Sequence, residues 1–167
     1  MALRDVDTEH LNECNEHLFN LGALEMSDSA LAHCKGFAHL PDLEGLNLSS
    51  CKELTSLEGL PEKITWLDID QCSSIQSFKG LEKLSGLTYF RATGLSALTD
   101  LRGCPRNENI RTFSPTDGKW SRTYLNWKSL ETLDGIESFP NLESLNLQNS
   151  TKLADISALK HCTNLKV

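Results

Sequence analysis

The sequence predicts an α/β solenoid, a right-handed superhelix of stacked coils with a parallel β-sheet on its concave face and short 3₁₀ or extended segments on its convex face. The main observation is a recurring phrase in which one apolar residue is followed by a second three positions later and a third two positions after that. The phrase starts at residues 21, 43, 64, 87, 110, 142 and 165. Successive starts lie 22, 21, 23, 23, 32 and 23 residues apart, a period that is typical of a solenoid repeat.

Each repeat is expected to contribute one strand and one returning segment. Residues 46–49 alternate between apolar and polar side chains, which predicts a short strand with one buried face. Strands of successive repeats then lie parallel, about 4.8 Å apart. In the third repeat, Ile75, Phe78 and Leu81 follow at intervals of three residues, a period that favours 3₁₀ turns or extended chain over long helices.

Two parts of the chain are predicted. Residues 1–20 are expected to form an N-terminal helical cap, because Leu11, Cys14 and Leu18 fall at helical spacing. Residues 21–167 are expected to form the repeat domain. Its last start is followed by only two residues, and the open strand edge that this leaves is expected to permit a homodimer through the C-terminal edge.

Composition narrows the function and the compartment. No run of 18 apolar residues exists, so no membrane span is expected. The first residues are charged where a signal peptide needs an apolar run, which predicts a cytoplasmic protein, or one exported without a signal peptide. The net charge of −7 argues against nucleic acid as the main ligand. The six cysteines form no C-x-x-C pair, which argues against zinc, and free buried thiols fit a reducing compartment.

Charge is distributed unevenly along the chain. Residues 1–84 carry 15 acidic and 6 basic side chains, whereas residues 85–167 carry 8 acidic and 10 basic ones. Chance variation on a solvated surface is one explanation. The alternative is that the two ends present different surfaces to partners or to each other, as a self-assembling solenoid requires.

Two stretches carry a resemblance to a known family. LEGLNLSSCKELTSLEGL, from residue 43, and LESLNLQNSTKLADISALKHCTNL, from residue 142, look like leucine-rich repeats of the short, roughly 22-residue class. The second is similar to bacterial internalin-type repeats and to the short repeats of phosphatase-regulating proteins, whereas SSCKEL and QCSSIQSF resemble plant immune-receptor repeats. The resemblance covers residues 21–167, and its internalin component implies a bacterial source.

The resemblance also implies a role for two cysteines. In this family the residue eight positions after a repeat start is Asn or Cys, turned inward to bond the backbone of the neighbouring coil. Cys51 and Cys72 occupy that position. Leu95 and Gly118 stand there in the fourth and fifth repeats, so we expect the inward ladder to be interrupted.

Partner binding is expected on the concave face, where the strands expose every second side chain. Trp and Tyr on neighbouring strands should lie side by side there, with charged residues beside them; the predicted partner-binding residues are Trp66, Asp68, Asp70, Tyr89 and Arg91. Trp, Tyr and Arg are enriched in binding hot spots. The alternative is a cross-strand aromatic pair that only stabilises the sheet. The carboxylates are expected to form salt bridges, since an open sheet lacks the dry pocket that shifts pKa values.

The insertion in the fifth repeat, residues 116–127, is the second predicted binding element. It follows a strand directly and should project from the rim of the sheet. Its predicted partner-binding residues are Trp120, Arg122, Tyr124 and Trp127. We interpret it as an aromatic and basic loop that holds an acidic partner; single-stranded nucleic acid is disfavoured by the overall acidity. The alternative is that the aromatic residues fold back and fill the irregular fifth coil.

Catalysis has little support in the sequence. No nucleophile and base share a recognisable motif, and no Gly-rich phosphate loop occurs. The sequence therefore predicts a protein–protein interaction module, without enzymatic activity or a cofactor, that binds a partner protein through the concave face and the rim loop. Two alternatives stay open: a self-assembling structural solenoid, joined head to tail or edge to edge, and the recruitment domain of a larger effector or enzyme.

Overall fold

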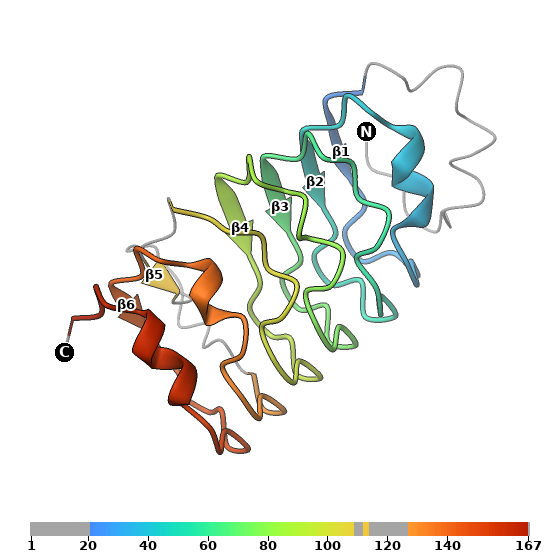
Figure 1. Ribbon diagram of the computed structural model, residues 1–167. Coiled ribbons are helices and arrows are strands. Elements are labelled where there is room, and N and C mark those ends of the chain that lie inside the picture. The colour runs from blue at the N-terminus through green and yellow to red at the C-terminus, as the bar shows by residue number, and fades with distance from the viewer. Residues whose placement is uncertain (1–20, 109–111, 114–126, 167) are drawn as a thin grey trace.

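The structure is a computed structural model that describes residues 21–108, 112–113 and 127–166. The predicted cap, residues 1–20, and all of the predicted insertion except its last residue lie outside the described residues. The described chain winds into successive coils, one for each repeat, whose strands stack side by side (Figure 1). The predicted solenoid with a parallel sheet is confirmed.

The strands are short and form two parallel sheets. The first sheet has four strands in sequence order: β1 (Ala23–Glu25), β2 (Gly45–Asn47), β3 (Trp66–Asp68) and β4 (Tyr89–Arg91). The second sheet pairs β5 (Thr112–Phe113) with β6 (Ser144–Leu145). Each strand residue faces the residue at the same position of the next repeat, as Leu46 faces Leu67. The predicted register is therefore confirmed in both sheets.

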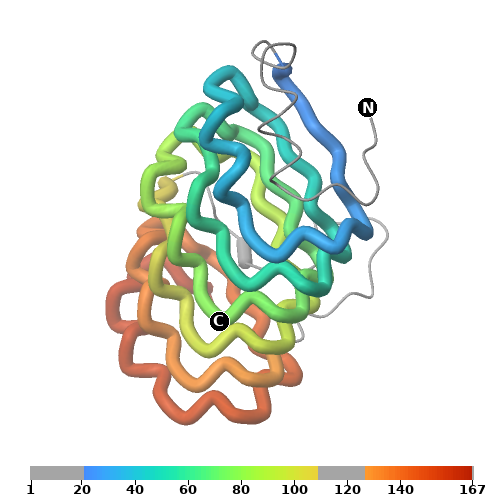
Figure 2. Tube along the Cα trace, turned by 90° about the vertical axis from the view of Figure 1, so that its right-hand side faces the viewer, coloured from blue at the N-terminus to red at the C-terminus, as the bar shows by residue number. Residues whose placement is uncertain are grey.

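The returning segments close each coil on the side away from the strands. Figure 2 shows the coils nearly end on, as flattened loops that follow one another. Within the described returning segments lie three short 3₁₀ helices: η1 (Lys35–His39), η2 (Ile136–Ser138) and η3 (Ser157–His161). Elsewhere the described returning chain is turn or extended, as the three-residue period predicted.

One column of apolar side chains runs through the coils. The inward strand residues Leu46 and Leu67 are fully buried, and so are Phe37 and Phe78 from the returning side. Phe78 meets Phe90 of the next coil edge to face, with ring centroids 5.4 Å apart and planes at 74°. Each coil therefore buries its apolar residues against its neighbours, which makes stability a sum of contacts between adjacent coils.

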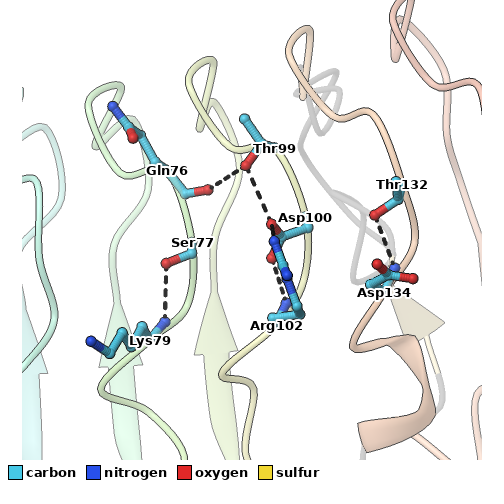
Figure 3. Close-up of polar contacts among 8 residues, drawn as sticks. All are labelled: Gln76, Ser77, Lys79, Thr99, Asp100, Arg102, Thr132 and Asp134. Carbon is cyan, nitrogen blue, oxygen red and sulfur yellow. Dashed lines mark hydrogen bonds and ion pairs between the residues drawn. The ribbon is translucent and has the colours of Figure 1, made fainter.

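A repeated turn shapes the returning side (Figure 3). Asp100 Oδ1 accepts the backbone N–H of Arg102 at 2.9 Å, and hydroxyls of Ser77 and Thr132 make the equivalent turns. The residue after each of these N–H donors is glycine, and Gly103 has a φ of 91°. A Cβ there would overlap the backbone of the preceding coil, so glycine permits both the turn and the close approach of the coils.

The sixth coil is less covered than the fifth. Ile156 occupies the position that Leu133 holds in the preceding coil, since each follows one residue of the bridge Thr132–Asp155. Leu133 is fully buried, whereas Ile156 is 57% exposed. The apolar column therefore reaches the surface at the sixth coil.

Candidate functional site

The two aromatic residues of the predicted site lie together on the outer face of the four-stranded sheet. Trp66 in β3 faces Tyr89 in β4, and their rings stack with centroids 5.0 Å apart and planes 10° from parallel. Trp66 is 37% exposed, and among the described residues only Ile156 is another large apolar side chain so exposed. The structure thus brings the two rings together as predicted.

One guanidinium bridges the two predicted carboxylates. Asp68 ends β3 and faces Arg91, which ends β4. Arg91 Nη1 lies 3.6 Å from Asp68 Oδ2, and Arg91 Nη2 lies 3.1 Å from Asp70 Oδ2. Both carboxylates therefore form the salt bridges that the sequence predicted. All five predicted residues of this part of the site meet on β3, on β4 and in the turn that follows β3.

Burial of the carboxylates corrects one expectation. We expected an open sheet with no dry surroundings, yet Asp68 is only 6% exposed and Asp70 only 8%. Burial raises the pKa of both carboxyls above its ordinary value, and the Arg91 guanidinium opposes the rise. The long Arg91 side chain and a neighbouring hydroxyl close over the carboxylates, so this part of the face is drier than its strand position suggests.

The local backbone explains why Asp68 stands where it does. Its Oδ1 accepts the backbone N–H of Asp70 at 2.9 Å. In the second coil Asn47 makes the same 2.9 Å bond with the N–H of Ser49, and Asn146 repeats it in the sixth coil. The turn needs one side-chain oxygen, which asparagine also supplies. The third coil is therefore distinct because it adds two carboxylates to a turn that other coils build without charge.

Thr93 is a member of the site that the sequence did not single out. Its side chain is buried, and its hydroxyl donates a hydrogen bond to Asp70 Oδ1. The signal for it was its position, since Thr93 lies six residues after its repeat start, as Asp70 does in the preceding repeat. Together Thr93 and Arg91 satisfy both oxygens of Asp70.

The structure corrects the predicted place of Trp127. We expected an exposed residue in a rim loop, but Trp127 is fully buried, and its indole N–H donates to the Ala92 carbonyl at 3.1 Å. The alternative, that aromatic residues fold back into the fifth coil, holds for this residue. The other predicted loop residues, Trp120, Arg122 and Tyr124, lie outside the described residues.

Trp127 also continues the inward ladder. Cys51 Sγ donates to the Met26 carbonyl at 3.2 Å, and Cys72 Sγ donates to the Leu48 carbonyl at 3.0 Å, as the resemblance implied. Each acceptor stands five residues after its repeat start, and Ala92 has that position in the fourth repeat. In the fifth repeat the matching position is Gly118, and glycine has no side chain to donate a hydrogen bond. The indole of Trp127 donates to the Ala92 carbonyl instead.

A hollow lies beside Trp66 on the side away from Tyr89. It has a volume of about 480 Å³ and lies over β1, β2 and β3. Its lining includes Ala23 and Gly45, which are the residues of β1 and β2 in line with Trp66, together with Glu25 and Glu44. The hollow forms because β1 and β2 carry small residues at this position, Ala23 and Gly45, whereas β3 carries the large ring of Trp66.

Metal chemistry and a membrane span find no support in the part of the chain that the structure describes. No three His, Cys, Asp or Glu side chains gather there in a way that would hold a metal ion. The helices seen within those ranges are too short to cross a bilayer. Burial raises the pKa of the Cys34 and Cys104 thiols, which makes them poor nucleophiles at neutral pH.

Comparisons with known proteins give distant matches. No family model matches the chain. Over 140 residues, 77% of the chain, it is 29% identical to Disease resistance protein RPS6 of Arabidopsis thaliana, and it spans 11% of the length of that relative. Among solved structures it is similar to internalin C2 of Listeria monocytogenes, with 21% identity and a TM-score of 0.33 over 92% of this chain and 82% of that one. A second internalin, inlF of the same organism, gives 15% identity and a TM-score of 0.24 over 95% and 79%.

The chain's own features identify its architecture. Strands recur at the repeat period in parallel register, and 3₁₀ or extended segments return between them. Inward side chains at one fixed position bond the backbone of the preceding coil. The chain therefore has the architecture of a leucine-rich repeat solenoid.

Proposed function

We propose that the chain is a protein-interaction module that binds a partner protein through the concave face of β3 and β4. The observation that carries the proposal is the exposed Trp66, held against Tyr89 next to the ion pairs of Arg91. Tryptophan, tyrosine and arginine are the residues most enriched in binding hot spots. A large exposed ring fixed in one orientation also loses little conformational entropy when a partner covers it.

The alternative role of the pair is to stabilise the sheet. An aromatic pair contributes about 0.5–1.5 kcal/mol beyond the burial of its surface. A partner-binding pair is expected to matter far more for association than for folding. The two roles therefore differ in which measurement a substitution changes.

The test is the double variant Trp66→Ala with Tyr89→Ala. Partners captured by the wild-type chain from a lysate are identified by mass spectrometry, and the affinity of the purified partner is then measured. We expect the double variant to bind at least roughly 30-fold more weakly, the size of a hot-spot loss. Its free energy of unfolding should fall by about 1 kcal/mol for the lost ring contact, in addition to the loss of the apolar surface that the two rings bury. A large loss of stability with unchanged affinity would mean that the pair is structural.

A control variant separates the concave face from the rest of the surface. Lys52 and Glu53 are exposed on the returning side, beyond the inward Cys51. Lys52→Ala with Glu53→Ala should leave both partner affinity and stability unchanged. Loss of binding in this control would place the partner on the convex face instead.

The role of the whole protein is a separate part of the proposal, because the chain matches only a small part of a longer relative. The chain spans 11% of its plant relative. We propose a cytoplasmic role, as the recruitment domain of a larger effector or enzyme or as a module by itself. Localisation of the tagged full-length protein in its native cell tests the compartment.

Self-assembly is a second proposed function, and exposed apolar side chains of the sixth coil favour it. Ile156 is exposed in the sixth coil, and Leu153, Leu159 and Leu165 around it are only partly buried. A second copy would cover these side chains. Sedimentation velocity over a range of protein and salt concentrations tests this, and a monomer under all conditions would overturn it.

A further inference from the structure

One face of the Trp66 ring is turned toward an unfilled space. The sheet register places Gly45 and Tyr89 on opposite sides of Trp66. Tyr89 stacks on one face of the ring, whereas the other side borders the hollow of about 480 Å³. The hollow therefore offers an aromatic wall that no neighbouring strand side chain of this chain covers, since Gly45 has no side chain.

Gly45 is not required by the backbone at its position. Its φ is not positive, and a Cβ built there would meet its nearest neighbour, Ala23 Cβ, at 3.4 Å, which is an ordinary contact. Glycine inside a strand weakens the strand, and it often marks a place where a ligand approaches the backbone closely. Leaving the space beside Trp66 empty therefore lowers the stability of the strand, and no described neighbour of Gly45 requires a glycine there.

Two carboxylates give the hollow its charge. Glu25 and Glu44 line it from β1 and from the residue before β2, and both are exposed. Lys63 forms an ion pair with Asp42 at 2.5 Å and also lies within electrostatic reach of Glu44. None of the described residues that line the hollow is Lys or Arg. An acidic hollow with an aromatic wall is complementary to a cation.

We propose that the hollow beside Trp66 binds an arginine side chain from a basic segment of the partner protein, with the guanidinium stacked on the open face of the indole and facing Glu25 and Glu44. This inference rests on the proposed function, because it names the chemistry of the partner at the same concave face. A guanidinium is planar, stacks on aromatic rings and pairs with carboxylates, so one group meets both features of the hollow. A phosphate group, in contrast, would be repelled by the two carboxylates.

The direct test uses a defined probe on the full chain. Acetyl-Gly-Arg-Gly-amide is titrated into the ¹⁵N-labelled protein, and the indole N–H signal of Trp66 is followed by NMR after assignment through its loss in Trp66→Phe. We expect a saturable shift with a dissociation constant of the order of millimolar, as for a single side chain. The same peptide with citrulline, which keeps the shape without the charge, should bind roughly three- to fivefold more weakly. Equal binding of the two peptides, or none by either, would overturn the proposal.

Charge substitutions test the two carboxylates. Glu25→Gln with Glu44→Gln should weaken the arginine peptide several-fold and leave the citrulline peptide unchanged. Glu53→Gln, on the returning side, is the matched control and should change neither. If the control weakens binding as much as the double variant does, the effect comes from net charge and the specific site is refuted.

Filling the hollow gives a second, independent test. Gly45→Val places a branched side chain against Trp66 and favours the strand, so it should abolish the indole shift without lowering the melting temperature. If the variant is destabilised, Gly45→Ala, whose single methyl fits, replaces it and should weaken binding. A shift that survives a well-folded Gly45→Val variant would overturn the proposal.

The two proposals fail in different ways. A partner whose affinity drops in the Trp66→Ala, Tyr89→Ala variant, but is unchanged in Glu25→Gln with Glu44→Gln, leaves the proposed function standing and refutes the arginine site. A partner indifferent to all four substitutions refutes the proposed function, whereas the peptide titration still reports on the hollow.

Discussion

The second and third coils share one backbone and differ in what they present. Both build the same 2.9 Å side-chain turn after the strand, and both follow it with a residue of positive φ, Ser50 at 64° and Gln71 at 60°. On the concave face, however, the second coil has Gly45 where the third coil has Trp66, and the two residues are neighbours in the sheet. Where the second coil has neutral turn residues, the third has two carboxylates. The repeat pattern therefore determines the backbone of each coil, and the outward-facing residues determine its surface chemistry.

Removing the positive charge of Arg91 should destabilise the third coil more than any other change proposed here. Arg91→Met keeps an apolar stem but leaves Asp68 and Asp70 buried without a cation, which we expect to lower the free energy of unfolding by about 2–3 kcal/mol at neutral pH. Denaturant unfolding measures the loss. Adding Asp68→Asn and Asp70→Asn should restore most of it, because no buried charge then remains. A triple variant as unstable as Arg91→Met alone would show that Arg91 stabilises by packing.

A single substitution, Asp68→Asn, should give the third coil the same neutral turn residue that the second coil has in Asn47. Asp68→Asn keeps the acceptor for the Asp70 N–H, as Asn47 does for Ser49, so stability should change little. Asp68→Ala removes the acceptor and should cost about 1 kcal/mol. Asn47→Ala in the second coil should cost the same amount. Unequal losses from the two alanine variants would mean that the two turns are not equivalent.

The smallest expected effect is a pH dependence that belongs to the third coil alone. The pKa of Asp68 and Asp70 is raised in the folded state, so the folded protein binds protons more tightly than the unfolded chain does. Their contribution to stability is therefore largest below the ordinary aspartate pKa of about 3.9 and is lost as pH rises through the raised values. The Asp68→Asn, Asp70→Asn variant should gain stability relative to wild type between pH 4 and pH 7. A constant difference across this range would contradict the assigned direction.

Carboxylates elsewhere do not disturb that comparison. Burial raises the pKa of Asp100, but the hydrogen bonds and charge of Arg102 together outweigh burial and lower this pKa below its ordinary value. The contribution of Asp100 to stability is therefore lost as pH falls. Asp100 is present in wild type and variant alike, so it cancels in their difference. The measured slope then reports on the third coil.

Periodicity was enough to predict the sheet and the partners within it. Side chains alternate along a strand, and equal repeat lengths bring equal positions together, so the stack of Trp66 on Tyr89 and the pairing of Asp68 with Arg91 followed from counting residues. The inward bonds of Cys51 and Cys72 were predicted from the resemblance and confirmed. Such features depend only on which residues occupy equal positions.

Features that depend on the reach of side chains between coils were not predicted. The dry surroundings of Asp68 and Asp70 arise because Arg91 and Thr93 extend back from the next coil. The hollow beside Trp66 arises because Gly45 has no side chain, and a missing side chain leaves no pattern in the sequence. Trp127 looked like an exposed loop residue because its partner, the Ala92 carbonyl, lies 35 positions earlier in the chain.

The indole bond of Trp127 makes the contact between the fourth and fifth coils depend on the identity of one residue. Its N–H donates to the Ala92 carbonyl, which lies 35 positions earlier in the chain, and the indole is fully buried. A side chain without this donor would leave the carbonyl short of that partner inside the protein, and such a loss costs about 1–3 kcal/mol.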